Sequence, residues 1–321
     1  MAKKVANSSK PRPTVAVTKP KPTATAPKVV TASVKVPVPV KKSKYIDPLT
    51  DFGFKRIFGN KVLLINFLNG VLNHTDGIAD LTYAPTIRTG IAKDDRTAIF
   101  DLYCTTATGI HIVVEMQLCW HKNYKQRTIH YLSRLIQEQA QRGKDWDYST
   151  PPIFLINIVD FEIDKELKKE DFLSRVKFMY EKINMPYYDD ATIVYLELPL
   201  FTKKVKELET NIDHWMYALK FMPQINRLPK ALQQGIFQKL FEQAKIAKMT
   251  KKQQNAYYKS VEDMSIIKNT VNFLTSTVDD LTSTVAEQAK ELEEYRRRYG
   301  SLSGTSQTPR HTSTSAQRKR R

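Results

Sequence analysis

The tripeptide Ala107-Thr108-Gly109 constrains this chain more than any other feature, because it predicts a β-hairpin and its register. It separates two runs of strand-forming residues, TAIFDLYCTT and IHIVVEMQLC. Glycine readily adopts the left-handed backbone conformation that closes a three-residue hairpin loop. Pairing the strands outward from this loop sets Asp101 opposite Glu115, and the Cβ atoms of such a pair lie roughly 5 Å apart on one face of the ladder.

The opposite face of the predicted hairpin supports this register. Its side chains are apolar or nearly so, and they pair across the ladder as Phe100 with Met116, Leu102 with Val114, and Cys104 with Ile112. A slip of one residue would turn this whole set outward. The apolar pattern therefore predicts that the two acids share a face, and Gln117, two residues beyond Glu115, shares it as well.

The two carboxylates repel each other at this separation unless a cation joins them or one of them is protonated. One interpretation is a solvated polar face with a lysine or arginine between the acids. The other is a covered face, because Ile99, Tyr103 and Val113 share it and favour burial. A buried acid without a partner is costly, so a covered face favours a metal ion between the two acids.

The formal net charge of +18 comes almost entirely from the two ends of the chain. Residues 1–44 hold eleven lysines and arginines and no acid, and residues 300–321 hold five and no acid, which leaves +2 for residues 45–299. Both tails are predicted to be disordered, because they lack large apolar groups and the first contains seven prolines. Such tails either attract a polyanion or act as solubilising arms.

Cys104 and Cys119 are the only cysteines, so the chain has no disulfide framework and suits a reducing compartment. No apolar run reaches the roughly 18 residues of a membrane span, and the N-terminus lacks the apolar core of a secretion signal. We therefore expect a cytoplasmic protein without a membrane partner.

The order of predicted elements indicates an α/β core with a mixed sheet. Thr50 is placed to cap a short helix, DFGFKRIF, and a second helix, KVLLINFLNGVLN, follows it. After the hairpin comes an amphipathic helix at roughly 121–142, whose apolar stripe includes Ile129 and Leu132. The run IFLINIV at 153–159 is typical of a fully buried strand. Two later segments, 172–180 and 191–198, have strand composition.

From Lys203 onward the pattern is helical, with a break at Pro223 and Pro229. Further along, the run LTSTV occurs twice, seven residues apart. Around it, mostly apolar residues recur in steps of four and three and form a seam along one side of the predicted helix. The seam residues are Ile267, Val271, Leu274, Val278, Leu281, Val285, Gln288, Leu292, Tyr295 and Tyr299. This seam predicts a coiled coil over residues 263–299, after a helical extension over 203–262. The alternative is a helix packed on its own domain.

Several motifs occur in an order and spacing typical of one nuclease family. They are DPLTDFGFKRIFG, DDRTAIFDLYC, VVEMQ, YKQRTIHYLSRLI with QRGKDW, and ELETNIDHWMYALKF followed by a long helical tail. Over roughly residues 45–260 the chain resembles the Rpn-type family of PD-(D/E)XK nucleases, recombination-promoting nucleases that are also described as transposases. The resemblance implies a restriction-endonuclease-like α/β core over residues 45–202, with a mixed sheet flanked by helices.

The resemblance also implies roles for the acid pair. Asp101 and Glu115 would bind Mg²⁺ (or Mn²⁺), for which carboxylate oxygens are the natural ligands, and the carbonyl of Met116 would be a further ligand. The cation would neutralise charge on the phosphate and lower the pKa of a water molecule. Position 117 usually holds lysine in this superfamily, whereas this chain has Gln117, as the Rpn-type branch does. Glutamine orients water but cannot accept its proton, so Gln117 implies slow catalysis.

Two further pairs of residues enter the candidate site by resemblance. Asp51 and Lys55 lie at i and i+4 on the DFGFK helix, which the family sets beside the metal; the alternative is a surface ion pair. Arg127 and Tyr131 match the family's Arg-x-x-x-Tyr. Arg127 either binds a phosphate through two hydrogen bonds or forms a salt bridge that orients one of the acids.

Three functions follow from these observations. The first is a Mg²⁺-dependent DNA endonuclease, linked to recombination or mobile elements, that acts as a homo-oligomer through the coiled coil and resides on the nucleoid when bound to DNA. The second is a catalytically weak or inactive module that binds nucleic acid or protein; Gln117 and the nearly neutral core favour it, since a cutting domain usually needs a basic groove. The third, a transposase, ranks lower, because the sequence has no helix-turn-helix reader and no third acid far downstream.

Overall fold

The computed structural model describes residues 43–73, 77–88, 98–139 and 147–300. Contacts divide the chain into two units, Met1–Pro39 and Val40–Arg321, and every described residue belongs to the second unit. Nearly all of the two tails that the sequence predicts to be disordered lies outside the described residues. Within the described ranges, no helix combines the length and the apolar character needed to cross a lipid bilayer.

Helix α1 (Asp51–Phe58) is the DFGFKRIF helix that the sequence predicts. Thr50 Oγ1 accepts a hydrogen bond from Gly53 N at 3.0 Å and so caps the first turn. Glycine is required at position 53, because a Cβ there would lie 2.0 Å from the Asp47 carbonyl oxygen. Helix α2 (Lys61–Leu72) follows and packs its buried apolar residues against α1.

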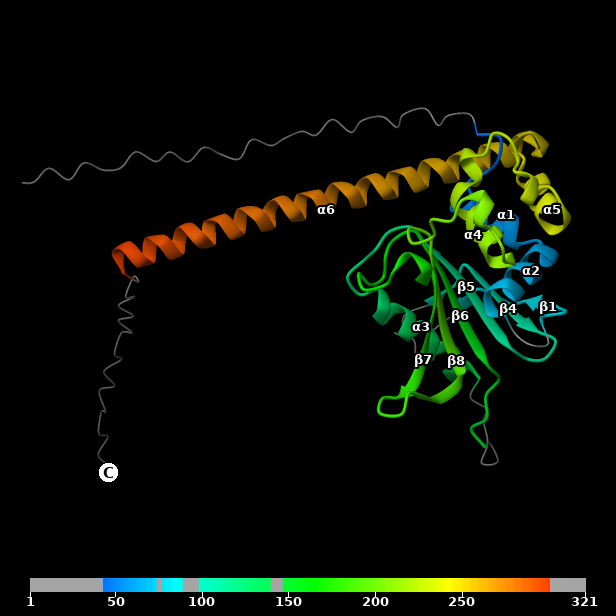
Figure 1. Ribbon diagram of the computed structural model, residues 1–321, viewed down its shortest axis with the longest axis horizontal. Coiled ribbons are helices and arrows are strands. Elements are labelled where there is room, and N and C mark those ends of the chain that lie inside the picture. Colours follow the sequence, from blue (N-terminus) through cyan, green and yellow to red (C-terminus); the bar gives the residue numbers. More distant parts are fainter. Residues whose placement is uncertain (1–42, 74–76, 89–97, 140–146, 301–321) are drawn as a thin grey trace, which may run out of the picture. The chain divides into compact units, whose positions relative to one another are not determined.

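A six-stranded mixed sheet adjoins these helices, with the strand order β1-β4-β5-β6-β8-β7 (Figure 1). Its strands are β1 (Leu81–Tyr83), β4 (Leu102–Thr106), β5 (His111–Gln117), β6 (Ile153–Val159), β7 (Leu173–Tyr180) and β8 (Met185–Glu197). Strands β5, β6 and β8 are parallel, and the other neighbouring strands are antiparallel. Two short strands, β2 (Ile87–Arg88) and β3 (Ala98–Ile99), form a separate pair. The predicted mixed-sheet α/β core is confirmed.

The hairpin has the predicted register. Strands β4 and β5 pair Leu102 with Val114, Tyr103 with Val113, and Cys104 with Ile112. Gly109 has a φ of +86°, and Thr106 N donates a hydrogen bond to Ile110 O at 2.9 Å across the loop. A three-residue loop therefore sets this register.

The predicted pairing of Phe100 with Met116 is wrong. The backbone bends at Asp101, just before β4, and Phe100 N donates to Thr86 O at 2.9 Å instead of joining the ladder. Phe100 therefore belongs to a different buried cluster from Leu102. The bend has a local cause, because the Asp101 carboxylate accepts the Met116 N–H that a regular ladder would use.

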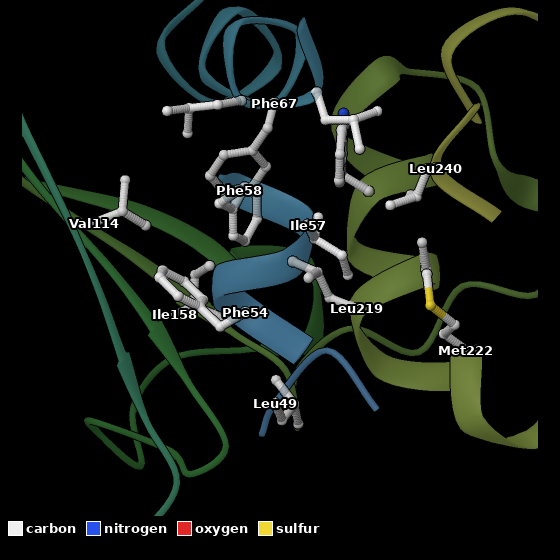
Figure 2. Packing of buried hydrophobic residues seen from close by; sticks show 14 of the residues in the cluster. Leu49, Phe54, Ile57, Phe58, Phe67, Val114, Ile158, Leu219, Met222 and Leu240 are labelled. Atoms are coloured by element: carbon white, nitrogen blue, oxygen red, sulfur yellow. The ribbon is translucent and has the colours of Figure 1, made fainter. Parts of the chain in front are cut away.

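Two buried clusters lie on opposite faces of the sheet. Helices α1 and α2, with α4 (Asn211–Phe221) and α5 (Gly235–Ala244), pack on one face, and α3 (Tyr124–Glu138) packs on the other. Figure 2 shows the first cluster, where Phe54, Ile57 and Phe58 of α1 lie between the strands and helices α4 and α5. The ring of Phe58 lies 4.8 Å from that of Phe67 and 5.9 Å from that of Trp215, measured between centroids.

Helix α3 contacts the sheet through part of the predicted stripe, because Leu132 and Leu135 are buried but Ile129 is not. Ile129 is 45% exposed, whereas Tyr124 and Thr128 are buried. The Tyr124 hydroxyl donates to Asn157 Oδ1 on β6 at 3.1 Å, and Thr128 Oγ1 lies 3.0 Å from the Tyr195 hydroxyl on β8. These hydrogen bonds form only when polar residues of the helix face the sheet, so a purely apolar pattern does not predict this orientation.

Helix α6 (Lys251–Tyr299) spans the whole region of the predicted coiled coil. Its first turns dock on the segment around α1, where the Tyr257 hydroxyl accepts a hydrogen bond from Asp47 N at 3.0 Å and Ser260 Oγ accepts one from Phe52 N at 3.1 Å. The seam residues beyond this docked part are mostly exposed, and pairing with another helix stays a prediction.

Replacing Phe58 with alanine is expected to lower the free energy of unfolding by about 3–5 kcal/mol, because Phe58 is fully buried between aromatic rings and the change leaves a cavity. Phe178→Ala is the matched control, since Phe178 is 45% exposed on β7 and its loss should cost under about 1 kcal/mol. Urea denaturation measures both. Equal losses for the two variants would contradict the packing described here.

Candidate active site

Asp101 and Glu115 are held together by two hydrogen bonds to the backbone. Asp101 N donates to Glu115 Oε1 at 3.1 Å, and Met116 N donates to Asp101 Oδ2 at 2.8 Å. Each carboxylate is thus fixed by the strand opposite its own. One oxygen of each, Asp101 Oδ1 and Glu115 Oε2, is not used in these two bonds and is a candidate ligand for a cation.

The pair lies toward the carboxyl end of the parallel strands. Glu115 on β5 is in register with Asn157 on β6, and Asn157 is in register with Tyr195 on β8. Because side chains alternate along a strand, these three residues share the face that α3 covers. Glu115 is only 4% exposed, so the covered-face interpretation of the hairpin is the one that the structure shows.

Burial and mutual repulsion perturb the pKa values of both acids. Burial raises the pKa of Glu115, and the negative charge of Asp101 raises it further, to about 8. Burial also raises the pKa of Asp101, and the nearby Asp51 carboxylate adds to this effect. A buried carboxylate pair in which one member prefers the protonated form is a typical marker of a functional site.

Arg127 on α3 contacts Gln117 more closely than it contacts the acids. Its Nη2 donates to Gln117 Oε1 at 2.6 Å and lies 4.0 Å from Glu115 Oε2. The guanidinium carbon lies 5.4 Å from the ring centroids of both Tyr124 and Tyr131, so two cation–π contacts hold it in place. Tyr131 thus contacts Arg127, and its own ring packs edge-on against Phe100.

A cavity of about 1090 Å³ opens beside Asp101, while the buried Glu115 is not part of its wall. Asp101 and Gln117 form part of its wall, and α1 contributes Asp51 and Lys55, whose ion pair measures 2.6 Å. Lys259 comes from the first turns of α6. The wall thus combines carboxylates with cationic side chains, which is the composition needed to bind a phosphate through a metal ion.

Among the described residues, no group of three or more histidine, cysteine, aspartate or glutamate side chains is arranged to hold a metal ion. Two carboxylates suffice for Mg²⁺, which usually keeps several water ligands and takes others from substrate phosphate. The pair fits a hard divalent cation, because such an ion would offset both the burial and the repulsion from Asp101 that raise the pKa of Glu115. The cation would lie between Asp101 and Glu115.

Sequence reasoning missed two residues that support this site, Tyr124 and Asn157. The Tyr124 hydroxyl donates to Asn157 Oδ1, and Asn157 Nδ2 in turn donates to the carbonyl oxygens of Leu155 and Val194. Asn157 is the one polar residue in the run IFLINIV. A buried polar residue needs partners, so its position within an apolar strand was a signal that this face of the sheet carries a polar network.

A mixed sheet covered by helices on both faces, with one acid near the end of the central strand β5 and another just before the neighbouring strand β4, defines an α/β protein of the restriction-endonuclease type. A sequence profile of the PD-(D/E)XK nuclease family transposases matches residues 48–271, and the chain belongs to this family. No match was found among curated proteins or among solved structures. Membership confirms the PD-(D/E)XK resemblance and supports a nuclease-like or transposase-like function.

The raised pKa of Glu115 predicts a pH-dependent stability for the metal-free protein. Between about pH 4.5 and pH 8 the folded state keeps a proton that the unfolded chain has released, so stability falls as the pH rises through this range. Glu115→Gln removes this effect while still accepting the hydrogen bond from Asp101 N. In EDTA, the variant should gain stability over the wild type as the pH rises, by about 3–4 kcal/mol between pH 5 and pH 8.

Denaturant unfolding at pH 5 and pH 8 measures this difference. The exposed acid Asp189 provides the matched control, because its carboxylate is paired with Lys177 on the surface. Asp189→Asn should show no such gain. If the free energies of unfolding of the wild type and Glu115→Gln differ by the same amount at both pH values, the raised pKa of Glu115 is contradicted.

Proposed function

We propose that this protein is a Mg²⁺-dependent endonuclease that hydrolyses phosphodiester bonds of DNA, in the context of recombination or mobile elements. One observation carries the proposal: the half-buried Asp101, paired with the buried Glu115 and like it raised in pKa, lines a cavity that also presents lysine side chains. Family membership agrees with it, since PD-(D/E)XK nucleases generally use divalent metals.

In this mechanism Asp101 and Glu115 would hold the metal, and the cavity would receive the scissile phosphate. A bound Mg²⁺ would supply positive charge to the phosphate and lower the pKa of a water molecule. Lys55 and Lys259 attract the phosphate backbone. Asp51 holds Lys55 in place and helps to raise the pKa of Asp101. It would therefore act beside the metal site rather than as a further metal ligand.

Gln117 acts as a hydrogen-bond donor in this mechanism. The guanidinium of Arg127 has donors only, so its partner on Gln117 must be the amide oxygen. The Gln117 amide nitrogen is then left to donate to the attacking water or to a phosphate oxygen. Lysine, the residue usual at this position, is also a donor there. Arg127 is thus an orienting residue for Gln117, with Tyr124 and Tyr131 fixing its guanidinium.

A second candidate function is a catalytically weak module that binds nucleic acid or protein. The absence of a base at Gln117 and the net charge of only +2 for residues 45–299 favour it. A transposase ranks below both. For either DNA-directed function we expect a cytoplasmic protein that associates with the nucleoid, with the basic tails adding salt-sensitive attraction to DNA.

Incubation with supercoiled plasmid tests the proposed function. In Mg²⁺ the wild type is expected to nick or linearise the plasmid, and EDTA should stop the reaction. Asp101→Asn should reduce the rate by about 100-fold or more, because it removes a metal-binding charge. Asp189→Asn, remote from the cavity, should cut like the wild type. Equal cutting by Asp101→Asn would exclude the acid pair from catalysis, and the absence of cutting by the wild type would favour the binding module.

The donor role of Gln117 makes a separate prediction. Gln117→Glu keeps the partner for Arg127 but removes the amide donor, so its cutting rate should fall by about 10-fold or more. Gln117→Lys keeps a donor at this position, although it loses the acceptor for Arg127, and it should retain cutting. The same plasmid assay measures both rates. If Gln117→Glu matches the wild type while Gln117→Lys is inactive, residue 117 does not act as a donor.

A further inference from the structure

An exposed apolar seam runs along the part of α6 beyond its docked first turns. Most of its side chains are at least half exposed: Ile267, Leu274, Val278, Leu281, Val285, Leu292, Tyr295 and Tyr299. Exposed apolar groups scattered singly are normal, but a continuous stripe in steps of four and three is typical of a helix that pairs with another helix. The seam is therefore suited to pairing with another helix, and the residue types along the seam indicate which helix that is.

We propose that the partner is a second copy of this chain, and that the two α6 helices form a parallel two-stranded coiled coil. In heptad notation, Val271, Val278 and Val285 fall at position a, and Leu274 and Leu281 fall at position d. β-Branched residues at a with leucine at d favour two parallel strands over three or four. The repeated LTSTV runs are thus two copies of the same dimer-forming heptad.

The flanking charges also favour the parallel arrangement. Glu291 falls at position g and Arg296 at the following position e, and a parallel pair sets each g residue beside the e residue of the next heptad on the other helix. The Glu291–Arg296 contact would form twice by symmetry. An antiparallel pair overlapping the same seam would instead set Glu291 and Arg296 against the threonine-rich end of the partner helix.

The buried area suffices for a stable dimer. Eight apolar side chains of the seam are 50–71% exposed, and each would bury roughly 100 Å² on pairing. That amounts to about 800 Å² for each chain, which is the usual size of a specific interface. Gln288, at position d, is the one polar residue of the seam, and a single buried polar residue fixes the register of a coiled coil.

The parallel arrangement has a consequence for the proposed nuclease, and to that extent it rests on the proposed function. Ile267, the first residue of the seam, and Met264, about one turn before it, also line the cavity beside Asp101. Lys268 is anchored to the sheet by an ion pair with Asp160 at 2.6 Å. Two parallel helices would therefore bring both cavities to the same end of the coiled coil, whereas antiparallel helices would separate them by about 48 Å, the length of the seam.

Light scattering of the full chain tests the dimer. The wild type should have twice the chain mass of 37.0 kDa. The double variant Leu274→Lys with Leu281→Lys should have the mass of one chain, because it sets charges into the seam. The matched control is Phe273→Lys with Ser283→Lys, which adds the same charges to outward positions of the same helix, and it should remain a dimer. A monomeric, trimeric or tetrameric wild type would overturn the proposal.

Cysteine cross-linking tests the orientation, in a background where Cys119 is replaced by serine. In a parallel pair each seam residue faces itself, so Leu274→Cys and Leu292→Cys should each form a disulfide-linked dimer alone. In an antiparallel pair the two variants should cross-link only when mixed, which would overturn the proposal. Ser283→Cys, on the outer side, controls for random collision. Neither experiment depends on nuclease activity, so failure here is distinct from failure of the proposed function.

Discussion

The repulsion between Asp101 and Glu115 is the constraint on which the rest of the site depends. The hairpin loop at Gly109 sets the register, and two backbone hydrogen bonds then hold the buried carboxylate of Glu115 beside the half-buried carboxylate of Asp101. This arrangement costs free energy in the metal-free protein, as the raised pKa of Glu115 shows. A cation bound between the acids would relieve that cost, so the same geometry that destabilises the empty site favours metal binding.

The helices around the acid pair supply the other side chains of the candidate site. Helix α3 covers its face of the sheet and supplies Arg127, which fixes the amide of Gln117. Helix α1 and the first turns of α6 contribute other parts of the cavity wall, including Asp51 and Lys55. The same α6 helix carries the exposed seam. A single helix thus links the wall of the proposed active site to the proposed dimer contact.

Local patterns predicted the hairpin register and the α1 helix, because loop length, glycine and strand alternation fix them within a few residues. Other features depend on distant contacts that no local pattern encodes. Phe100 leaves the ladder because the Asp101 side chain competes for the Met116 N–H. Ile129 is exposed because Thr128 pairs with the hydroxyl of Tyr195 on a strand far along the chain. The contact of Arg127 with Gln117 likewise required the packing of α3 on the sheet.

Isothermal titration calorimetry tests most directly whether a cation replaces the proton on Glu115. Mn²⁺ is titrated into the full chain at pH 7, in two buffers of different ionisation enthalpy. The predicted result is one ion bound per chain with release of about one proton, because the pKa of Glu115 lies near 8 in the metal-free protein. Glu115→Gln should abolish both the binding and the proton release. Binding without proton release, or binding that persists unchanged in Glu115→Gln, would contradict a metal site at this acid pair.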